Sequence, residues 1–402
     1  MANRFDEYLE RRGTGSMKWS EPLLPAHARR GGAGSPVSDP GTMIPMWLAD
    51  MDFPTAPPVI DALARRVQHG VFGYASAGDD YFRAIIGWHE RRHGWDVDRD
   101  WIIPTSGSVP AINVALQTLT RPGDGVIVQP PVFHPFAQSI ENNARRVVPN
   151  ALVLDGGRYR MDFDDLARKA ADPRVRMLIL CSPHNPVGRV WSEEELRTLG
   201  RICSDCDVIV VSDEVHCDLA MPGSRFTTCA VADPVIASRL VHCHGPSKTF
   251  NLPGLKVSTT IIPDERLRNH FLTGLRNLNE LFGVSVLGTV ALQAAYDKGE
   301  DWLTELLDYL DGNARLVDEY LDANLPQVRR IRADATYFAW LDCRDLGPLA
   351  VDLKQRLQDR ARVWLEDGAT YGAEGAGFLR MNIACPRTLL AAALERISAA
   401  LR

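Results

Sequence analysis

The chain has 402 residues, 45% of them hydrophobic and 24% charged, which allows a large buried core and more than one domain. The formal net charge of −6 gives no electrostatic reason to expect nucleic acid or an anionic membrane as a partner. No run of about 18 apolar residues occurs, so no membrane span is predicted.

Residues 1–45 are polar and mixed, with a glycine-rich piece at 31–34. This composition predicts an arm that completes a smaller domain, rather than a domain core. The arm shows no apolar stretch of the kind found in secretory signals. The eight cysteines are mostly solitary within apolar runs, which fits a reducing compartment, and we therefore expect a cytoplasmic protein.

Residues 44–54, reading IPMWLADMDFP, are rich in apolar side chains but also carry Asp50 and Asp52. Such a segment either packs into the core or lines a site. Helical periodicity then predicts helices over residues 57–72 and 81–93.

A loop of small residues at 105–110, TSGSVP, leads into a predicted helix over 111–119. A loop of this kind presents free backbone N–H groups at the start of the helix, and these suit a phosphate. Ordinary capping of the helix by Ser106 or Ser108 explains the same pattern.

The middle of the chain alternates short apolar strands with helices. Helices are predicted over 136–143 and 192–203, the second with a capping box formed by Ser192 and Glu195. The alternation predicts an α/β fold with a mostly parallel sheet and helices on both faces. Ligands of such sheets bind at the carboxyl ends of the strands. The predicted strands are 125–129, 175–181, 207–211, 240–243 and 257–262, and polar clusters follow three of them at 182–188, 212–216 and 245–248.

The last part of the chain is helical from 286 to about 325 and then alternates again, which suits a smaller α+β domain. We therefore expect an arm (1–45), a large domain (46–288) and a small C-terminal domain (289–402). The strands predicted in the small domain are 328–332, 336–341, 363–365 and 378–383.

Lys248 lies between two apolar runs, on a loop of small and turn-forming residues. It is either a surface lysine beside a strand or an amine nucleophile, whose pKa burial and nearby cations would lower. Asp213, at the end of a buried strand, would need a cationic partner to compensate its desolvation. Together with an amide, an aromatic face and a phosphate loop, these groups are what pyridoxal 5′-phosphate requires. The further candidates are Asn185, Phe133, Ser247, Lys256 and the loop at 106–109.

His242 and His244 flank Cys243 within one apolar run, and strand alternation places both histidines on one face. Packed histidines explain this pattern better than metal ligands do. No metal site is predicted.

Motifs from 46 to 387 cover nearly the whole chain. They are MWLADMDF (46–53), FGY (72–74), PVFHPF (131–136), SPHNPVGRVW (182–191), SDEVHCDL (212–219), SKTFNLPGL (247–255) and FLRMNIACPR (378–387). In this order they resemble the class I/II aminotransferase superfamily of pyridoxal-phosphate enzymes, fold type I. The forms HNPVGRVW, DEVH and NIACPR are most similar to its cystathionine β-lyase-like C–S lyases. The resemblance implies a mostly parallel, seven-stranded sheet flanked by helices, a smaller α+β domain, and a homodimer with shared active sites.

The resemblance also implies roles for residues. Lys248 matches the lysine that forms a Schiff base with the cofactor and then acts as the base, and Asp213 matches the partner of the pyridine nitrogen. Phe133 and His216 stand where tyrosine is common in the family, and Lys256 stands where arginine is common. The implied substrate contact is Arg380, which binds the α-carboxylate. Trp47, Ala49 and Asp50 either line the substrate side or pack in the core. The implied cofactor contacts are Gly107, Ser108, Val109, Phe133, Asn185, Asp213, His216, Ser247, Lys248, Lys256 and, from a neighbouring subunit, Tyr74.

The resemblance implies a carbon–sulfur β-lyase that cleaves cystathionine, or a related L-cysteine S-conjugate, to a thiol, pyruvate and ammonia. An aminotransferase on the same scaffold is the close alternative, because both reactions begin with removal of the Cα proton. A second alternative is a regulatory binding protein that acts through a transcription factor, as some relatives do.

Overall fold

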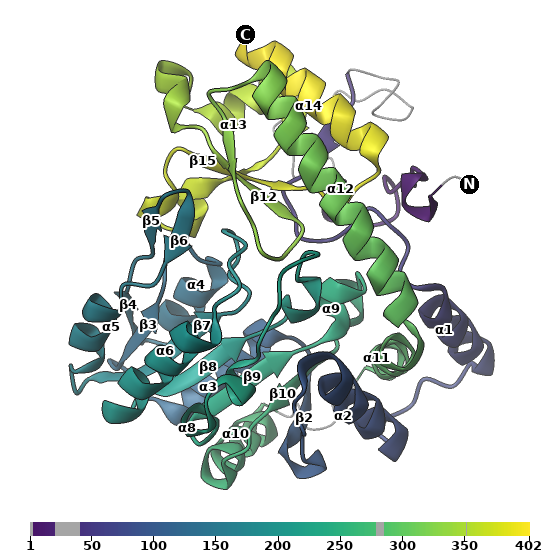
Figure 1. Ribbon diagram of the computed structural model, residues 1–402. Helices are drawn as coiled ribbons and strands as arrows, with labels where there is room; N and C mark the ends of the chain where they lie inside the picture. The colour runs from purple at the N-terminus through teal and green to yellow at the C-terminus, as the bar shows by residue number, and fades with distance from the viewer. Residues whose placement is uncertain (1–2, 21–40, 279–284, 351) are drawn as a thin grey trace.

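The computed structural model describes residues 3–20, 41–278, 285–350 and 352–402, so the glycine-rich piece predicted at 31–34 lies outside the described residues. A large sheet with its helices forms the lower part of the view, and a smaller sheet with two long helices forms the upper part (Figure 1). None of the described helices is both long enough and apolar enough to cross a membrane.

The large sheet has seven strands in the order β2-β10-β9-β8-β7-β3-β4. All neighbours pair in parallel except β10, which is antiparallel to both β9 and β2. The predicted mostly parallel sheet is therefore confirmed. The strands are β2 (Ile102–Thr105), β3 (Gly125–Val128), β4 (Arg146–Pro149), β7 (Val175–Cys181), β8 (Ile209–Asp213), β9 (Leu240–His244) and β10 (Ser258–Ile261).

Alternate side chains of the central strands pack against helices on opposite faces of this sheet. In β7, Leu178 and Leu180 belong to one apolar cluster with α5 and α6. Met177 and Ile179 belong to the other cluster, with α3, α4 and α10. The helices of the two faces are α3 (Ser108–Leu119), α4 (Pro135–Asn142), α5 (Phe163–Ala170), α6 (Glu193–Asp205) and α10 (Glu265–Asn277), with the short α7 (Cys229–Ala232) and α8 (Pro234–Ala237) beside α6.

A third group of helices packs at the β2 end of the sheet and links the two parts of the molecule. Helix α12 is the connecting element, because it begins beside α11 and runs up to α14 (Figure 1). The group consists of α1 (Pro57–His69), α2 (Asp79–His93), α11 (Val286–Lys298) and α12 (Glu300–Asn324).

The smaller sheet is antiparallel, in the order β11-β12-β15-β14. Trp19, Ile44 and Met46 from the N-terminal part pack in the same apolar cluster as the C-terminal helix. This contact is what the predicted arm requires, while the boundaries at 45/46 and 288/289 remain a prediction. The elements are β11 (Arg329–Ile331), β12 (Phe338–Asp342), β14 (Glu366–Asp367), β15 (Phe378–Asn382), α13 (Leu353–Arg356) and α14 (Arg387–Leu401), with the pair β1 (Ile44–Pro45) and β13 (Val363–Trp364) and the hairpin β5 (Val153–Asp155) and β6 (Arg158–Arg160).

The predicted capping box at the start of α6 is present. The Ser192 hydroxyl accepts from the Glu195 backbone N–H at 3.1 Å, and the Glu195 carboxylate accepts from the Ser192 N–H at 2.7 Å. Glu195 also receives both N–H groups of one Arg189 nitrogen, at 2.7 and 2.8 Å. The helix start is therefore fixed to the loop that precedes it.

We expect Ser192→Ala to remove one capping bond and to cost about 1 kcal/mol of stability. The measurement is the urea concentration at the unfolding midpoint, which should fall. Ser204→Ala on the same helix is the matched control, because alanine is the better helix former and no loss is expected there. An equal loss in both variants would contradict a capping role for Ser192.

Candidate active site

A cavity of about 540 Å³ lies at the carboxyl ends of β7 and β8 and at the start of α3. It collects most of the side chains that the sequence singled out. Eleven predicted residues line it: Ala49, Gly107, Ser108, Val109, Phe133, Asn185, Asp213, His216, Ser247, Lys248 and Lys256. Ser106, which belongs to the predicted loop at 106–109, lines it as well. The remaining lining residues were not predicted: Pro110, Cys181, Val215, Pro253 and Val257.

A second depression, of about 800 Å³, lies at the other end of the strands, near Ile209. Asp207 forms ion pairs there with both Arg176 and Arg239, although the basic side chains that line the depression outnumber the acidic ones. It offers no reactive group of the kind found in the first cavity.

Lys248 lies on α9 (Pro246–Thr249), the short helix that follows β9. Its Nζ donates to the backbone carbonyl of Ala49 at 2.8 Å. Removal of the amine from bulk water, and after it the nearby guanidinium of Arg380, lower the pKa of Lys248 to about 8. The cation Lys256 also lowers it, but less than burial does, so both causes that the sequence suggested contribute to the lowered pKa.

Asp213 ends β8 and is buried. Its Oδ1 accepts from the backbone N–H of Val215 at 3.3 Å, a long hydrogen bond. Burial raises the pKa of Asp213 to about 6. A cation placed against this carboxylate would reverse that shift, so the residue fits the protonated ring nitrogen of a bound cofactor.

The start of α3 is open to the cavity. Gly107 occupies the N-cap position, and no side chain caps the helix. The interpretation in which Ser106 or Ser108 caps the helix is therefore wrong. Because the first N–H groups of a helix lack partners within it, they can bind a phosphate. Ser247 and Lys256 line the same cavity and add a hydroxyl and a positive charge.

Arg380, on β15, lies behind Asn185 instead of on the cavity wall. Its Nη1 donates to Asn185 Oδ1 at 3.1 Å and its Nη2 to the Trp47 carbonyl at 2.7 Å. The guanidinium also lies over the ring of Phe338, 4.1 Å from the centroid. Arg380 Nε is buried without a hydrogen-bond partner, which is the condition expected of a group that awaits a carboxylate.

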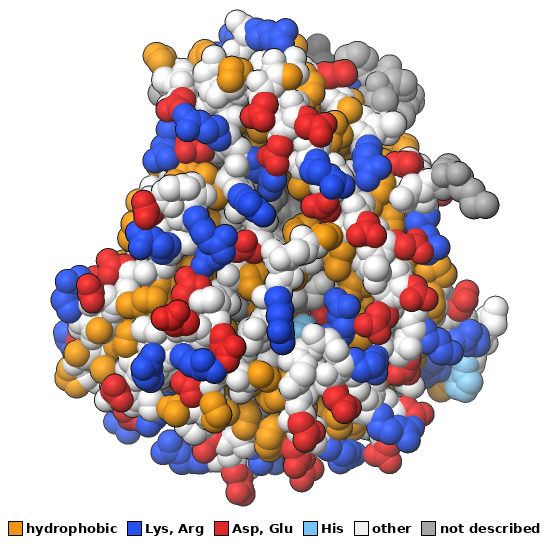
Figure 2. All heavy atoms as spheres, in the orientation of Figure 1, with side chains coloured by type: hydrophobic (Ala, Val, Ile, Leu, Met, Phe, Trp, Pro, Cys, Tyr) orange, Lys and Arg blue, Asp and Glu red, His pale blue; other side chains and the backbone are white. Residues whose placement is uncertain are grey.

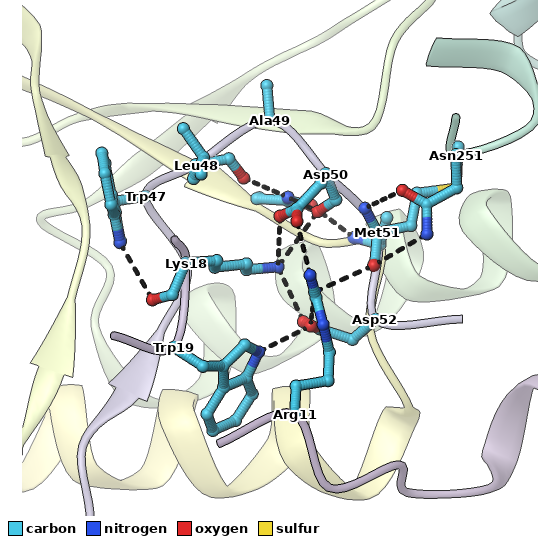
Figure 3. A network of polar contacts seen from close by, with 12 residues as sticks. Arg11, Lys18, Trp19, Trp47, Leu48, Ala49, Asp50, Met51, Asp52 and Asn251 are labelled. Atoms are coloured by element: carbon cyan, nitrogen blue, oxygen red, sulfur yellow. Dashed lines mark hydrogen bonds and ion pairs between the residues drawn. The ribbon is translucent and has the colours of Figure 1, made fainter. Parts of the chain in front are cut away.

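The segment from Trp47 to Asp52 is fastened from two sides. Arg11 binds both Asp50, at 2.5 Å, and Asp52, at 2.6 Å. Lys18, only 1% exposed, binds Asp52 at 2.7 Å, and Figure 3 shows both cations between the two carboxylates. Asp50 therefore anchors the N-terminal part of the chain here, and its predicted place on the substrate side is unconfirmed.

Asn251 holds the far end of the same segment. Its amide accepts from Met51 N at 2.9 Å and donates to the carbonyls of Met51, at 3.0 Å, and Phe53, at 2.9 Å. This residue was missed as a site element, although it lies three residues after Lys248 within a motif quoted from the sequence. An asparagine amide can accept from a backbone N–H and donate to a backbone carbonyl at the same time. This property of Asn251 is the signal that could have identified it as a residue that holds another segment.

Tyr74 is not among the residues that line the cavity of its own chain. It is fully exposed, and its neighbours Val71 and Phe72 are 61% and 54% exposed. Apolar side chains in one exposed stretch mark a surface that another molecule covers. The position excludes Tyr74 from the site described above and leaves the predicted role in a second subunit open.

The cavity therefore combines an amine of lowered pKa, a buried carboxylate without a cationic partner, and an uncapped helix start. These groups fit the aldehyde, the ring nitrogen and the phosphate of pyridoxal phosphate, respectively. His216 also lines the cavity; burial and the nearby Lys248 hold its pKa well below the usual value, so its ring is neutral.

Comparison with known proteins places the chain in a family. The pattern of the aminotransferase class I and II family matches residues 44–397. The cystathionine beta-lyase PatB of Bacillus subtilis is 41% identical over 397 residues, which cover 99% of each protein. Cystalysin from Treponema denticola, whose crystal structure contains pyridoxal 5′-phosphate, superposes with a TM-score of 0.92 at 32% identity, over 100% of this chain and 99% of that one.

A PLP-bound C–S lyase from Staphylococcus hominis superposes with a TM-score of 0.88 at 31% identity, over 99% of this chain and 98% of that one. The family pattern and the B. subtilis relative each cover most of the sequence. The chain therefore belongs to the aminotransferase class I and II family.

Proposed function

We propose that the protein is a pyridoxal-phosphate-dependent carbon–sulfur β-lyase. Its substrate is cystathionine or a related L-cysteine S-conjugate, and its products are a thiol, pyruvate and ammonia. The observation that carries this proposal is the convergence of Lys248, Asp213 and the open start of α3 on one cavity. The lyase activity, rather than another reaction of the family, is supported by the names of the B. subtilis and S. hominis proteins.

The residues of the cavity would hold the cofactor at three points. Lys248 would bind its aldehyde carbon, Asp213 would face its ring nitrogen, and the N–H groups of Ser108 and Val109 would bind its phosphate, with Phe133 beside the ring. When bound, pyridoxal phosphate supplies an electron sink for the pair left at Cα.

Lys248 would have a second task as a free amine. With a pKa near 8, it would take the proton from the substrate Cα near neutral pH. Arg380 binds the α-carboxylate and so fixes the direction of the Cα–H bond. Its guanidinium is already held by Asn185, Trp47 and Phe338, and therefore loses little freedom on binding.

The exposed stretch around Tyr74 favours a homodimer in which each subunit completes the other's site. A second copy of the chain would cover Val71 and Phe72 and would bring Tyr74 to the phosphate end of the partner's cavity. A cytoplasmic location is also part of the proposal, since all eight cysteines are free thiols, as in a reducing compartment.

We expect the purified holoenzyme to form pyruvate from cystathionine with no 2-oxo acid added. Lys248→Ala should lower this rate roughly 10²- to 10⁴-fold or more, because the base is lost. Lys169→Ala, which removes a lysine paired with Asp165 on α5, is the control and should keep the rate. Turnover that requires a 2-oxo acid would show an aminotransferase instead.

The lowered pKa of Lys248 predicts how attachment of the cofactor depends on pH. Only the neutral amine attacks the aldehyde, so the rate should rise with pH through a midpoint near 8 and level off at higher pH. The rate is followed by the visible absorbance band of the bound cofactor after its addition to cofactor-free protein. Arg380→Gln removes a nearby cation and should move the midpoint to higher pH. A midpoint near the ordinary lysine value of about 10.4 in the wild type would contradict the assignment.

Shared sites predict that two inactive variants restore each other. A dimer of one Lys248→Ala chain and one Tyr74→Ala chain keeps one complete site, since the second chain has Lys248 and receives Tyr74 from the first. Pyruvate formation should therefore reappear when the two variants are unfolded and refolded together. Lys248→Ala mixed with Asp213→Ala is the control and should stay inactive, because both residues belong to the same chain's site. Lack of recovery in the first mixture would refute the role of Tyr74.

A further inference from the structure

Four side chains with metal-binding atoms meet beneath the helix that carries Lys248. His93 ends α2, Cys217 and Asp218 lie in the turn after β8, and His244 ends β9. One ligand atom from each residue lies within 4.8 Å of all the others. Among the described residues this is the one group of its kind, and none of its members lines the cofactor cavity.

The distances within the group resemble those between the ligands of one zinc ion. His93 Nε2 is 3.5 Å from Cys217 Sγ and 3.0 Å from Asp218 Oδ1, and His244 Nε2 is 3.4 Å from Asp218 Oδ2. In a tetrahedral site, bonds of about 2.3 Å to sulfur and about 2.0–2.1 Å to nitrogen and oxygen place neighbouring ligand atoms roughly 3.3–3.6 Å apart. The wider pairs of the group have to close by about 1 Å to reach this geometry.

Hydrogen bonds without a metal can satisfy Asp218, which accepts from Trp88, His93, His244 and Thr249, but they leave the thiol proton of Cys217 without an acceptor. His93 Nε2 faces both Cys217 Sγ and Asp218 Oδ1, but in a neutral imidazole one nitrogen is either a donor or an acceptor. If it donates to Asp218, it cannot accept the thiol proton of Cys217. A cation resolves this conflict, because every ligand then directs a lone pair toward the same point.

Charge and surroundings support a cation as well. The carboxylate of Asp218 and the thiolate that Cys217 would form on binding would together carry two negative charges in a buried region, and a divalent ion would make their sum zero. Trp88 Nε1 donates to Asp218 Oδ1 at 3.1 Å and Thr249 Oγ1 to Oδ2 at 2.9 Å. These two contacts would orient the carboxylate, as partners of metal ligands commonly do.

An unpartnered imidazole also borders the group. His89 lies one helical turn before His93 on α2, and its ring centroid is 4.7 Å from that of His244. It is 1% exposed, and neither of its ring nitrogens has a hydrogen-bond partner. A buried polar group without a partner is a sign of a missing ion or water.

We propose that His93, Cys217, Asp218 and His244 form a structural binding site for a divalent transition-metal ion with the ligand preferences of zinc. Four protein ligands close the coordination shell, so the ion does not take part in the reaction. Binding sends the thiol proton of Cys217 to solvent. The ion joins α2, the turn after β8 and the end of β9, and through Thr249 it steadies the helix of Lys248.

The test uses the holoenzyme equilibrated with ZnCl₂ and freed of excess metal by gel filtration. We expect one zinc per chain by elemental analysis. The zinc X-ray absorption spectrum should show one sulfur at about 2.3 Å beside nitrogen or oxygen at about 2.0–2.1 Å. Zinc should raise the melting temperature, and EDTA should reverse the rise.

Cys217→Ser should remove the sulfur from the spectrum and abolish the rise in melting temperature. Cys229→Ser is the matched control, since that cysteine is also buried but contacts Ser212 and lies outside the group. It should keep both signals. Zinc content well below one per chain in the wild type, or bound zinc without sulfur, overturns the proposal, and this result does not depend on the folding of any variant.

Discussion

The register of three parallel strands is the constraint on which the site depends. Cys181 of β7 lies opposite Asp213 of β8, and Asp213 lies opposite Cys243 of β9. Parallel strands that end on one line deliver their following loops to one edge of the sheet. A slip of one residue in β8 would turn Asp213 to the opposite face and remove the only carboxylate among the residues that line the cavity.

The same edge buries several acidic side chains, and each has a different compensation. Glu214 receives the hydroxyl of Ser212 and the backbone N–H of Cys229 and faces His242 at 3.0 Å. Burial raises the pKa of Glu214, but the combined effect of these contacts is larger and lowers it to about 2. Asp213, in contrast, has little compensation within the protein. Asp213, the carboxylate with few compensating contacts, is thus the one that lines the cavity. Glu214 does not line it, and its contacts stabilise the fold. On the face of the molecule in Figure 2, acidic and basic side chains are interspersed.

Local patterns in the sequence were sufficient for most of the large sheet and for the cofactor side of the site. The strand predicted over 207–211 is in fact β8, Ile209–Asp213, because the polar pair Ser212 and Asp213 continues the ladder beyond the last apolar residue. The hairpin of β5 and β6 was not predicted, since its strands have only three residues each, although Tyr159 at the centre of β6 is buried. Strands this short are below the roughly four to eight residues over which alternation indicates a strand.

Contacts between distant segments could not be predicted from patterns. Arg11 meets Asp52 across 41 positions, and nothing in either local sequence indicates the partner. His93 and His244 come together only because α2 packs beside the end of β9, so the sequence showed His244 as a strand residue next to a cysteine. The prediction of no metal site rested on neighbours in the sequence alone. The proposed zinc site, in which His244 meets residues distant in the sequence, disagrees with that prediction.

The segment from Trp47 to Phe53 is held largely through its backbone. Arg380, Lys248 and Asn251 all bind its main-chain carbonyls, and Tyr337 donates to the same Ala49 carbonyl as Lys248, at 3.1 Å. Main-chain contacts survive most changes of side chain. The side chain of Ala49 on the cavity wall is thus free to vary in evolution, or in directed evolution, without loss of the segment's position. This part of the wall can therefore change while Lys248 and Asp213, to which the proposed chemistry is assigned, stay in place.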